Sequence, residues 1–358
     1  MRHPFAHEAP CGREAVIRPT VKTQRLPHAT LRALSVFLAA ALVAFSLLLP
    51  AESQKPTKVP RIGYLDGGWP TPEFQHLLDA FRHGLRAFGY RDGQNIAIEY
   101  RWAEGRYERL PQLAGELALQ KVDIIVTGVA QAARAAKQAT RDIPIVMVAA
   151  VDPVGFGLVK GLARPGENIT GLSNLSPELA AKHLELLKET APRISRVAVL
   201  WNAANPIEVR LWRARQAAAR VLGLTLVSVE VRSSDDLALA LSRMIKERPE
   251  ALHVLGDPLL LGNRIRITAF AAQNRLPIVS DASEFTEAGG LMSYGVHLPD
   301  LFRSSARFVD KILKGEKAAD LPVEQPTRFE LVINLKTAKT LGLSISPSVL
   351  VLADRVVE

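Results

Sequence analysis

The strongest constraint on the fold is a regular alternation of two kinds of segment from residue 60 onward. Short aliphatic and β-branched runs are separated by longer amphipathic stretches, as expected for parallel strands covered by helices in an α/β fold. The ten expected strands are residues 61–65, 95–102, 123–128, 143–150, 168–173, 196–202, 224–231, 251–257, 276–281 and 291–296. Ten strands are too many for one small domain.

Length and composition agree with a two-lobed globular protein. The chain has 358 residues, of which 48% are hydrophobic and 23% charged, which suits about two domains. We expect two doubly wound, Rossmann-like lobes with parallel sheets, the first changeover falling near residues 171–177. The formal charge is +9, but the basic residues are scattered among 36 acidic ones. A scattered charge does not indicate nucleic-acid binding, so no nucleic-acid partner is expected.

The N-terminal segment has the order of a secretory signal. Six basic and two acidic residues in 1–32 precede the apolar run 34–50, and Ala51 and Ser53 supply the small-x-small cleavage pattern. We expect residues 1–53 to be a signal peptide and the mature protein to be periplasmic or extracytoplasmic. An uncleaved membrane anchor is the alternative, because the run approaches spanning length. The only cysteine, Cys11, lies in this segment, which leaves no thiol in the mature chain.

Polar residues collect where the expected strands end. In open parallel sheets, ligands bind outside the carboxyl ends of the strands, where helix N-termini also present free N–H groups. Two lobes would present two such polar rims to each other across a cleft. The expected ligand-binding residues of the first rim are Asp66, Gly67, Trp69, Thr127, Gly128 and Asp152, and those of the second are Asn202, Asn205, Asp257 and Glu284.

These residue types predict a zwitterionic ligand. Thr127 and neighbouring backbone N–H groups can hold a carboxylate, while Asp152, Asp257 or Glu284 can pair with an amino group. An amino acid fits both halves of this pattern. Trp69 follows a strand at the rim, so it either stacks on a ligand ring or belongs to the core.

Other motifs were weighed as signs of an enzyme or a metal site. Gly155, Gly157 and Gly161 follow an apolar run, but Asp152 intervenes and its charge would repel a pyrophosphate, so these glycines indicate a turn. His76 and His83 have no third ligand nearby for a metal. Neither a nucleophile elbow nor a phosphate-binding loop is present in the sequence. We therefore expect no catalysis, no cofactor and no metal.

Several long motifs resemble those of one family of transport proteins. The stretches 152–187, 197–206, 287–295 and 307–343 resemble extracytoplasmic substrate-binding proteins of the ABC transporter family that includes tryptophan- and tyrosine-binding members. The likeness covers nearly all of residues 61–358. It implies the type I periplasmic-binding fold, capture of a small molecule by hinge closure, and membrane permease subunits as partners. A monomer is expected.

The resemblance also implies that the chain crosses between the lobes three times. The first lobe would hold residues 54–173 and 291–325, the second 174–290 and 326–358. Tyr294, at the end of its expected strand, would then belong to the first rim. The segment 128–131 departs from the family pattern within the expected pocket, so the ligand of other members does not transfer directly. An effector-binding regulatory domain of the same fold, or a nucleotide-using enzyme, are the alternatives.

Overall fold

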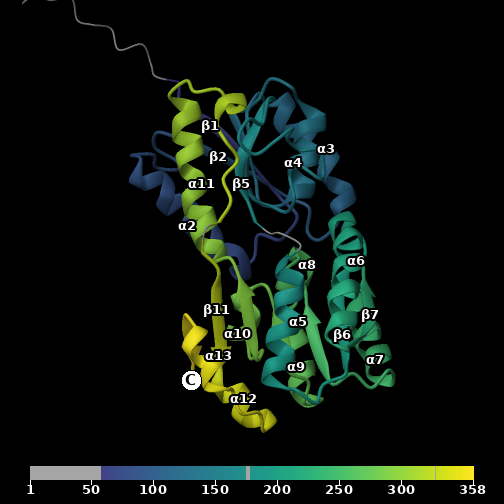
Figure 1. Ribbon diagram of the computed structural model, residues 1–358. Helices are drawn as coiled ribbons and strands as arrows, with labels where there is room; N and C mark the ends of the chain where they lie inside the picture. Colours follow the sequence, from purple (N-terminus) through teal and green to yellow (C-terminus); the bar gives the residue numbers. More distant parts are fainter. Residues whose placement is uncertain (1–57, 175–177, 327) are drawn as a thin grey trace, which may run out of the picture. The chain divides into compact units, whose positions relative to one another are not determined.

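The computed structural model describes residues 58–358, except 175–177 and 327 (Figure 1). The expected signal peptide and its cleavage site lie outside these residues. All ten expected strands are present, and two more follow them near the C-terminus. The strands are β1 (Arg61–Asp66), β2 (Ala97–Trp102), β3 (Ile124–Thr127), β4 (Ile145–Ala150), β5 (Ile169–Ser173), β6 (Arg196–Asn202), β7 (Thr225–Val231), β8 (Ala251–Val254), β9 (Ile278–Ser280), β10 (Met292–Gly295), β11 (Glu330–Asn334) and β12 (Arg355–Val357).

Helices occupy the amphipathic stretches between the strands. They are α2 (Pro72–Ala87), α3 (Leu110–Leu119), α4 (Ala130–Ala139), α5 (Glu178–Thr190), α6 (Pro206–Val221), α7 (Asp236–Lys246), α8 (Pro258–Gly262), α9 (Arg264–Gln273), α10 (Ser283–Glu287), α11 (Leu298–Leu313), α12 (Leu335–Leu341) and α13 (Pro347–Leu352). Single-turn 3₁₀ helices lie at Tyr107–Arg109 and Ala318–Asp320. Helices α6, α8 and α13 begin alike, with Asn205, Asp257 or Ser346 capping the first turn and a proline directly after it. This is the usual start signal of a helix.

The first sheet has the parallel order β2-β1-β3-β4-β5. Alternate residues of each strand face opposite sides of this sheet. Ile62 and Tyr64 of β1 join a core with α2 and α11, whereas Leu65 joins a core with α3 and α4. Both faces are therefore covered, as the near-continuous apolar character of the strands predicts.

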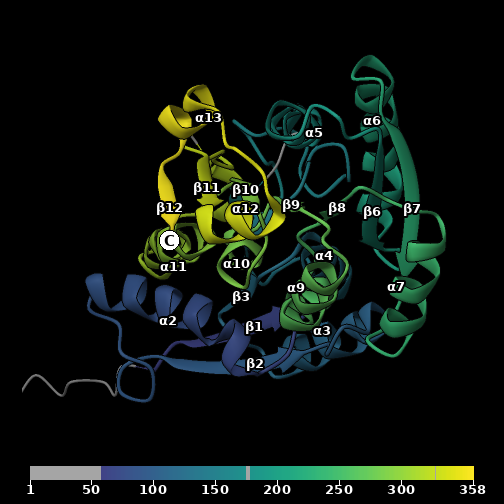
Figure 2. The ribbon, with the colours of Figure 1, turned by 90° about the horizontal axis from the view of Figure 1, so that it is seen from below.

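Helix α11 belongs to the first sheet although it is far from it in sequence. It lies beside α2 in both views of the ribbon (Figures 1 and 2) and also contacts β4 and β5. Gly84 of α2 allows the close approach, because a Cβ there would lie 2.2 Å from the Arg303 carbonyl oxygen of α11. The chain therefore returns to the first lobe after entering the second.

Among the described residues, the second sheet has seven strands in the order β12-β11-β10-β9-β8-β6-β7, and Figure 2 shows these strands side by side. Its pairs are parallel except β10 with β11, which is antiparallel. Leu184 and Leu187 of α5 pack on one face of this sheet, and Leu241 of α7 and Ile267 of α9 pack on the other. This lobe is thus also doubly wound.

The middle crossing lies later than expected. Residues 291–325 were assigned to the first lobe, but Met292–Gly295 forms β10, which pairs with β9 and β11 inside the second sheet. The return to the first lobe therefore begins after Gly295, and Tyr294 belongs to the second sheet. The other two crossings lie between β5 and α5 and between residues 324 and 330. An isolated β-bridge between Leu172 and Glu324 joins the two segments just before these crossings.

Candidate functional site

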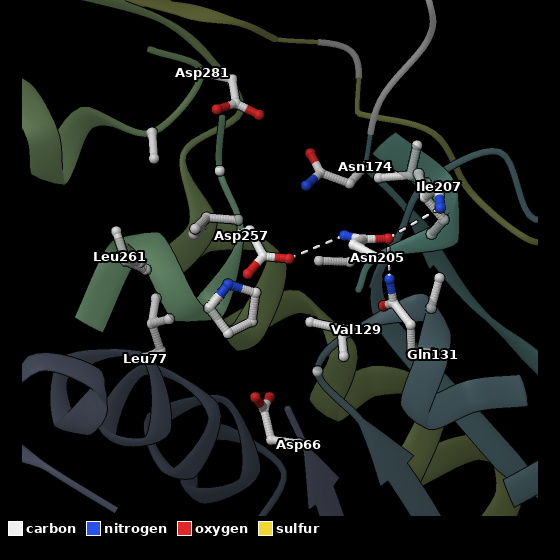
Figure 3. Close-up of a pocket in the computed structure, with 18 of the residues that line it drawn as sticks. Asp66, Leu77, Val129, Gln131, Asn174, Asn205, Ile207, Asp257, Leu261 and Asp281 are labelled. Atoms are coloured by element: carbon white, nitrogen blue, oxygen red, sulfur yellow. Dashed lines mark hydrogen bonds between the residues drawn. The ribbon is translucent and has the colours of Figure 1, made fainter. Parts of the chain in front are cut away.

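A cavity lies between the two sheets' strand-end loops, within the described residues 58–358 (Figure 3). Its empty space is about 910 Å³, including its opening to solvent. Its polar lining comes from Asp66, Tyr107, Gly128, Gln131, Asn174, Asn205, Glu208, Gly256, Asp257 and Asp281. Its apolar lining includes Tyr64, Phe74, Leu77, Val129, Ala130, Ala149, Val151, Ile207, Pro258, Leu261, Ala282, Val296, Leu298 and Phe302.

The lining residues occupy the positions that parallel sheets reserve for ligands. Asp66 ends β1 and Gly128 follows β3 in the first sheet, while Asn205, Asp257 and Asp281 follow β6, β8 and β9 in the second. Since the carboxyl ends of parallel strands lie at one edge of a sheet, each sheet contributes one polar rim. The expected pair of facing rims therefore exists.

Asp257 is the most heavily hydrogen-bonded acid of the cavity. Its carboxylate accepts from Asn202 Nδ2 at 3.1 Å, Asn205 Nδ2 at 3.0 Å and the Leu259 N–H at 2.9 Å. From the first lobe, the Tyr107 hydroxyl donates to it at 2.8 Å. Burial raises the pKa of Asp257, and these hydrogen bonds oppose the rise. Asp257 thus joins the two lobes.

Two further polar contacts link the lobes. Gln131, in the first turn of α4, donates from Nε2 to Asn205 Oδ1, as Figure 3 shows. His76 of α2 lies 3.2 Å from Glu284 of α10, measured from Nε2 to Oε1. Direct side-chain contacts therefore connect the two lobes both in the cavity and beside it.

Asp66 lies beneath the cavity on the first-lobe side. Its carboxylate accepts from the Tyr64 hydroxyl and the Gly68 N–H, both at 2.8 Å. Burial raises the pKa of Asp66. A Cβ at Gly128 would lie 1.6 Å from Asp66 Oδ2, so only glycine leaves room for this carboxylate.

A buried titratable cluster lies behind the second-lobe wall. Glu208 lines the cavity and forms an ion pair with Arg215 at 3.0 Å, two turns further along α6. Burial raises the pKa of Glu208 to about 7. The rings of His183 and His253 pack edge to face nearby, with their centroids 5.0 Å apart. Burial lowers the pKa of both imidazoles.

Helix α4 presents uncapped N–H groups to the cavity. Its N-cap residue, Val129, has no side chain able to accept a hydrogen bond, and Gly128, Val129, Ala130 and Gln131 all line the cavity. The first-turn N–H groups of a helix have no intrahelical acceptor. Together with the helix dipole they favour an anionic group such as a carboxylate.

The expected site residues fall into two groups. Asp66, Gly128, Asn205 and Asp257 line the cavity, whereas Gly67, Trp69, Thr127, Asp152, Asn202, Glu284 and Tyr294 do not. In the second group, Asn202 donates a hydrogen bond to Asp257. Gly67 lies against the Tyr107 ring, and a Cβ added at Gly67 would lie 2.5 Å from that ring. Thr127 is buried within the first sheet.

The remaining expected residues outside the cavity contact other parts of the protein. The Asp152 carboxylate accepts from the Gly155 N–H at 2.9 Å and so stabilises the turn that the glycines form. The Tyr294 carbonyl accepts a 2.5 Å hydrogen bond from His183 Nε2, the imidazole being the donor. The Trp69 ring packs between Gly105 of the first lobe and Gly262 of α8. It therefore contacts both lobes beside the cavity.

Sequence reasoning missed several lining residues. Asp281 lies in the strand-end segment 280–284, from which Glu284 was chosen instead. Glu208 and Gln131 lie within first helical turns, where their spacing alone gives no sign of facing a cavity. Tyr107 reaches Asp257 from a single-turn 3₁₀ helix 150 residues earlier, so no local pattern could have identified it.

Comparison with known proteins assigns the family. The model of the family described as ABC transporter substrate binding protein matches residues 71–357. The chain belongs to this family. The two-lobed type I periplasmic-binding fold is thereby confirmed, and a leucine binding protein from Thermotoga maritima shares that fold at 16% identity, with a TM-score of 0.53.

Individual relatives and solved structures illustrate the relationship. A "Tyrosine-binding protein" of Clostridioides difficile (strain R20291) is 28% identical over 76% of this chain and 78% of its own length. An ABC domain from Streptococcus pneumonia in complex with L-Trp is 29% identical, with a TM-score of 0.76 over 83% of this chain and 99% of its own. A ligand-free, open substrate binding protein from Clostridium difficile is 28% identical, with a TM-score of 0.59 over 84% and 99%.

Proposed function

We propose that this protein captures an amino acid, an aromatic one, for import by an ABC transporter. The single observation that carries the proposal is the cavity between the two polar rims, which combines an uncapped helix N-terminus, carboxylates and apolar walls. A zwitterion with an apolar side chain needs all three. No chemical step on the ligand is required.

The charged ends of an amino acid have suitable partners in the cavity. The ligand carboxylate would bind the first-turn N–H groups of α4, which carry the positive end of the helix dipole. The ligand ammonium group would be neutralised by the acids that line the cavity, since charge-assisted hydrogen bonds are the strong ones. These two poles would orient the ligand.

The apolar lining suits a large, flat side chain. Phe74, Leu77, Leu261 and Phe302 form walls contributed by both lobes, and burying an aromatic ring against such walls is strongly favourable. The tyrosine-binding relative and the L-Trp complex support an aromatic ligand. Because segment 128–131 departs from the family pattern, the ligand is to be identified by titration and not taken from the relatives.

Capture by hinge closure is supported by the contacts between the rims. Tyr107, Gln131 and His76 of the first lobe each contact a residue of the second. At nearly equal identity and coverage, the TM-score is 0.76 to the L-Trp complex and 0.59 to the ligand-free, open protein. In the proposed cycle a ligand bridges both rims and stabilises the closed form.

The transport role requires an extracytoplasmic location and membrane partners. We propose that residues 1–53 direct export and that the closed monomer delivers its ligand to permease subunits. Within the part of the chain that the structure describes, no helix is both long and apolar enough to span a bilayer. Fractionation of the producing cells tests the location, and recovery in the cytoplasm would favour a regulatory role instead.

Isothermal titration calorimetry tests the ligand assignment. The mature chain should be titrated with each of the twenty standard amino acids, after unfolding and refolding to remove any copurified molecule. Tryptophan, tyrosine or phenylalanine is expected to bind with a Kd of about 1 µM or tighter, equivalent to roughly −8 kcal/mol. Failure of every amino acid to bind would overturn the proposal.

A further inference from the structure

Among the described residues, four acids line the cavity, and they are not equivalent. Asp66, Glu208, Asp257 and Asp281 all contribute to its surface, while none of the described lining residues is lysine, arginine or histidine. Such a lining recognises a cationic group. Which acid performs that recognition depends on which carboxylate still has hydrogen-bonding capacity.

Three of the four acids already have close donors from the protein. Asp66 accepts from a tyrosine hydroxyl and a backbone N–H at 2.8 Å. Glu208 is paired with buried Arg215 at 3.0 Å. Asp257 accepts four hydrogen bonds from the protein, including the one that Tyr107 donates across the cleft. These carboxylates stabilise the rims themselves.

Asp281 differs from the other three in its partners. Among the described residues, the hydrogen bond to its side chain comes from the Ser280 hydroxyl at 3.5 Å, which is beyond a normal O–H···O distance. Its carboxylate packs over Gly256, where an added Cβ would lie 2.7 Å from Oδ1 and 2.9 Å from Oδ2. The absence of a side chain at Gly256 therefore makes room for a carboxylate whose own acceptor sites remain open.

A second acceptor lies on the same side of the cavity. Asn174 lines the cavity, and its Oδ1 is buried without a hydrogen-bond partner among the described residues. Figure 3 shows its amide and Asp281 on the side opposite to Asp66. A protonated amino group offers three N–H donors, which suit acceptors of this kind, whereas a carboxylate or an uncharged apolar group offers none.

We propose that Asp281 is the specificity-determining residue that selects ligands with a protonated amino group. This inference rests on the proposed function, and it assigns Asp257 a different task, the joining of the two rims. The amino group of an α-amino acid is held at the second lobe by Asp281. Analogues that lack this amino group bind without using it.

The test compares ligands with and without the amino group on matched variants. Wild type, Asp281→Asn and the control Asp235→Asn are titrated with L-tryptophan and L-tyrosine, and with indole-3-propionate and 3-(4-hydroxyphenyl)propionate. Asp235 is an exposed acid of the same lobe. Asp281→Asn is expected to weaken amino-acid binding by about 10- to 100-fold and to leave the two deaminated analogues unchanged. Asp235→Asn should behave as wild type.

The outcomes separate this inference from the proposed function. If wild type binds none of the twenty amino acids, the proposed function fails and the inference fails with it. If wild type binds one and Asp281→Asn binds it equally well, only the inference fails. Equal losses for the amino acid and its deaminated analogue would assign Asp281 a structural role, which thermal melting of the variant would also reveal, and would likewise overturn the inference.

Discussion

Asp152 and Asp257 have the same local sequence but different roles. Each follows an apolar strand and precedes a proline, and both were expected to bind the ligand. Asp257 caps α8 and lines the cavity. Asp152 instead accepts from the Gly155 N–H in a turn, with φ at +41°, a left-handed conformation that is uncommon for residues other than glycine. The tertiary context therefore decides what the carboxylate of an Asp-Pro pair faces.

The raised pKa of Glu208 predicts that the stability of the protein depends on pH. Its pKa is raised to about 7 in the folded protein, chiefly by burial, so the folded state holds this proton over a pH range in which the unfolded chain has released it. Its contribution to stability is therefore present below the unfolded pKa and is lost as pH rises through about 7. In Glu208→Gln, which resembles the protonated acid in shape, this loss is absent.

We expect the free energy of unfolding of wild type, relative to Glu208→Gln, to fall by up to about 3 kcal/mol between roughly pH 5 and pH 8. Urea unfolding of both proteins across this range measures it. His183 and His253 titrate in both proteins, and their contributions cancel in the difference. A difference that is constant with pH would contradict the assignment of the titration to Glu208.

The pairing of α2 with α11 shows how one residue holds two distant elements together. A Cβ at Gly84 would lie 2.2 Å from the Arg303 carbonyl oxygen and 2.8 Å from the Ala306 Cβ. Neither atom is at the end of a flexible side chain, so an added methyl group would force the helices apart. This contact anchors the returning segment to the first sheet.

Gly84→Ala is therefore expected to lower the free energy of unfolding by about 1–3 kcal/mol through overpacking. Gly115→Ala in α3 is the matched control, since a Cβ there meets nothing within 4 Å. It should raise stability by roughly 0.5–1 kcal/mol, because alanine restricts the unfolded chain and favours the helix. Denaturant unfolding of both variants gives the two values, and a stabilising Gly84→Ala would refute the close-packing argument.

The two lobes are connected by the crossings of the chain and by polar contacts across the cleft. Among these contacts, the bond from Tyr107 to Asp257 is part-buried and reaches a carboxyl group that is itself buried. Such a bond contributes only when the lobes are together. Its loss should therefore favour the open form without disturbing either lobe.

Tyr107→Phe is expected to weaken ligand binding by roughly tenfold, in keeping with one lost hydrogen bond to a charged group. Calorimetry measures the affinity, and small-angle X-ray scattering measures the ligand-induced decrease in radius of gyration. Tyr90→Phe is the control, because the Tyr90 hydroxyl bonds to Asp310 within the first lobe at 3.2 Å. Equal effects of the two variants on affinity would show that the interlobe position of Tyr107 is not what matters.

Much of the fold could be predicted from the sequence because the signals are local. Apolar runs of strand length, capping residues such as Asn205 and prolines at first helical positions all act over a few residues. The expected strands agree with the structure, and polar residues at their carboxyl ends form the two rims. Hydrophobic periodicity and cap chemistry are enough for these features.

Only the tertiary structure decided three other features. It placed β10 in the second sheet, antiparallel to β11. It also made Asp281, and not Glu284, a lining residue of the cavity. Each depends on contacts between segments far apart in the chain. Residues three positions apart, such as Asp281 and Glu284, can face a cavity or another helix with the same local pattern. The direction in which a strand-end side chain points is set by the packing of the opposite lobe, which no local pattern encodes.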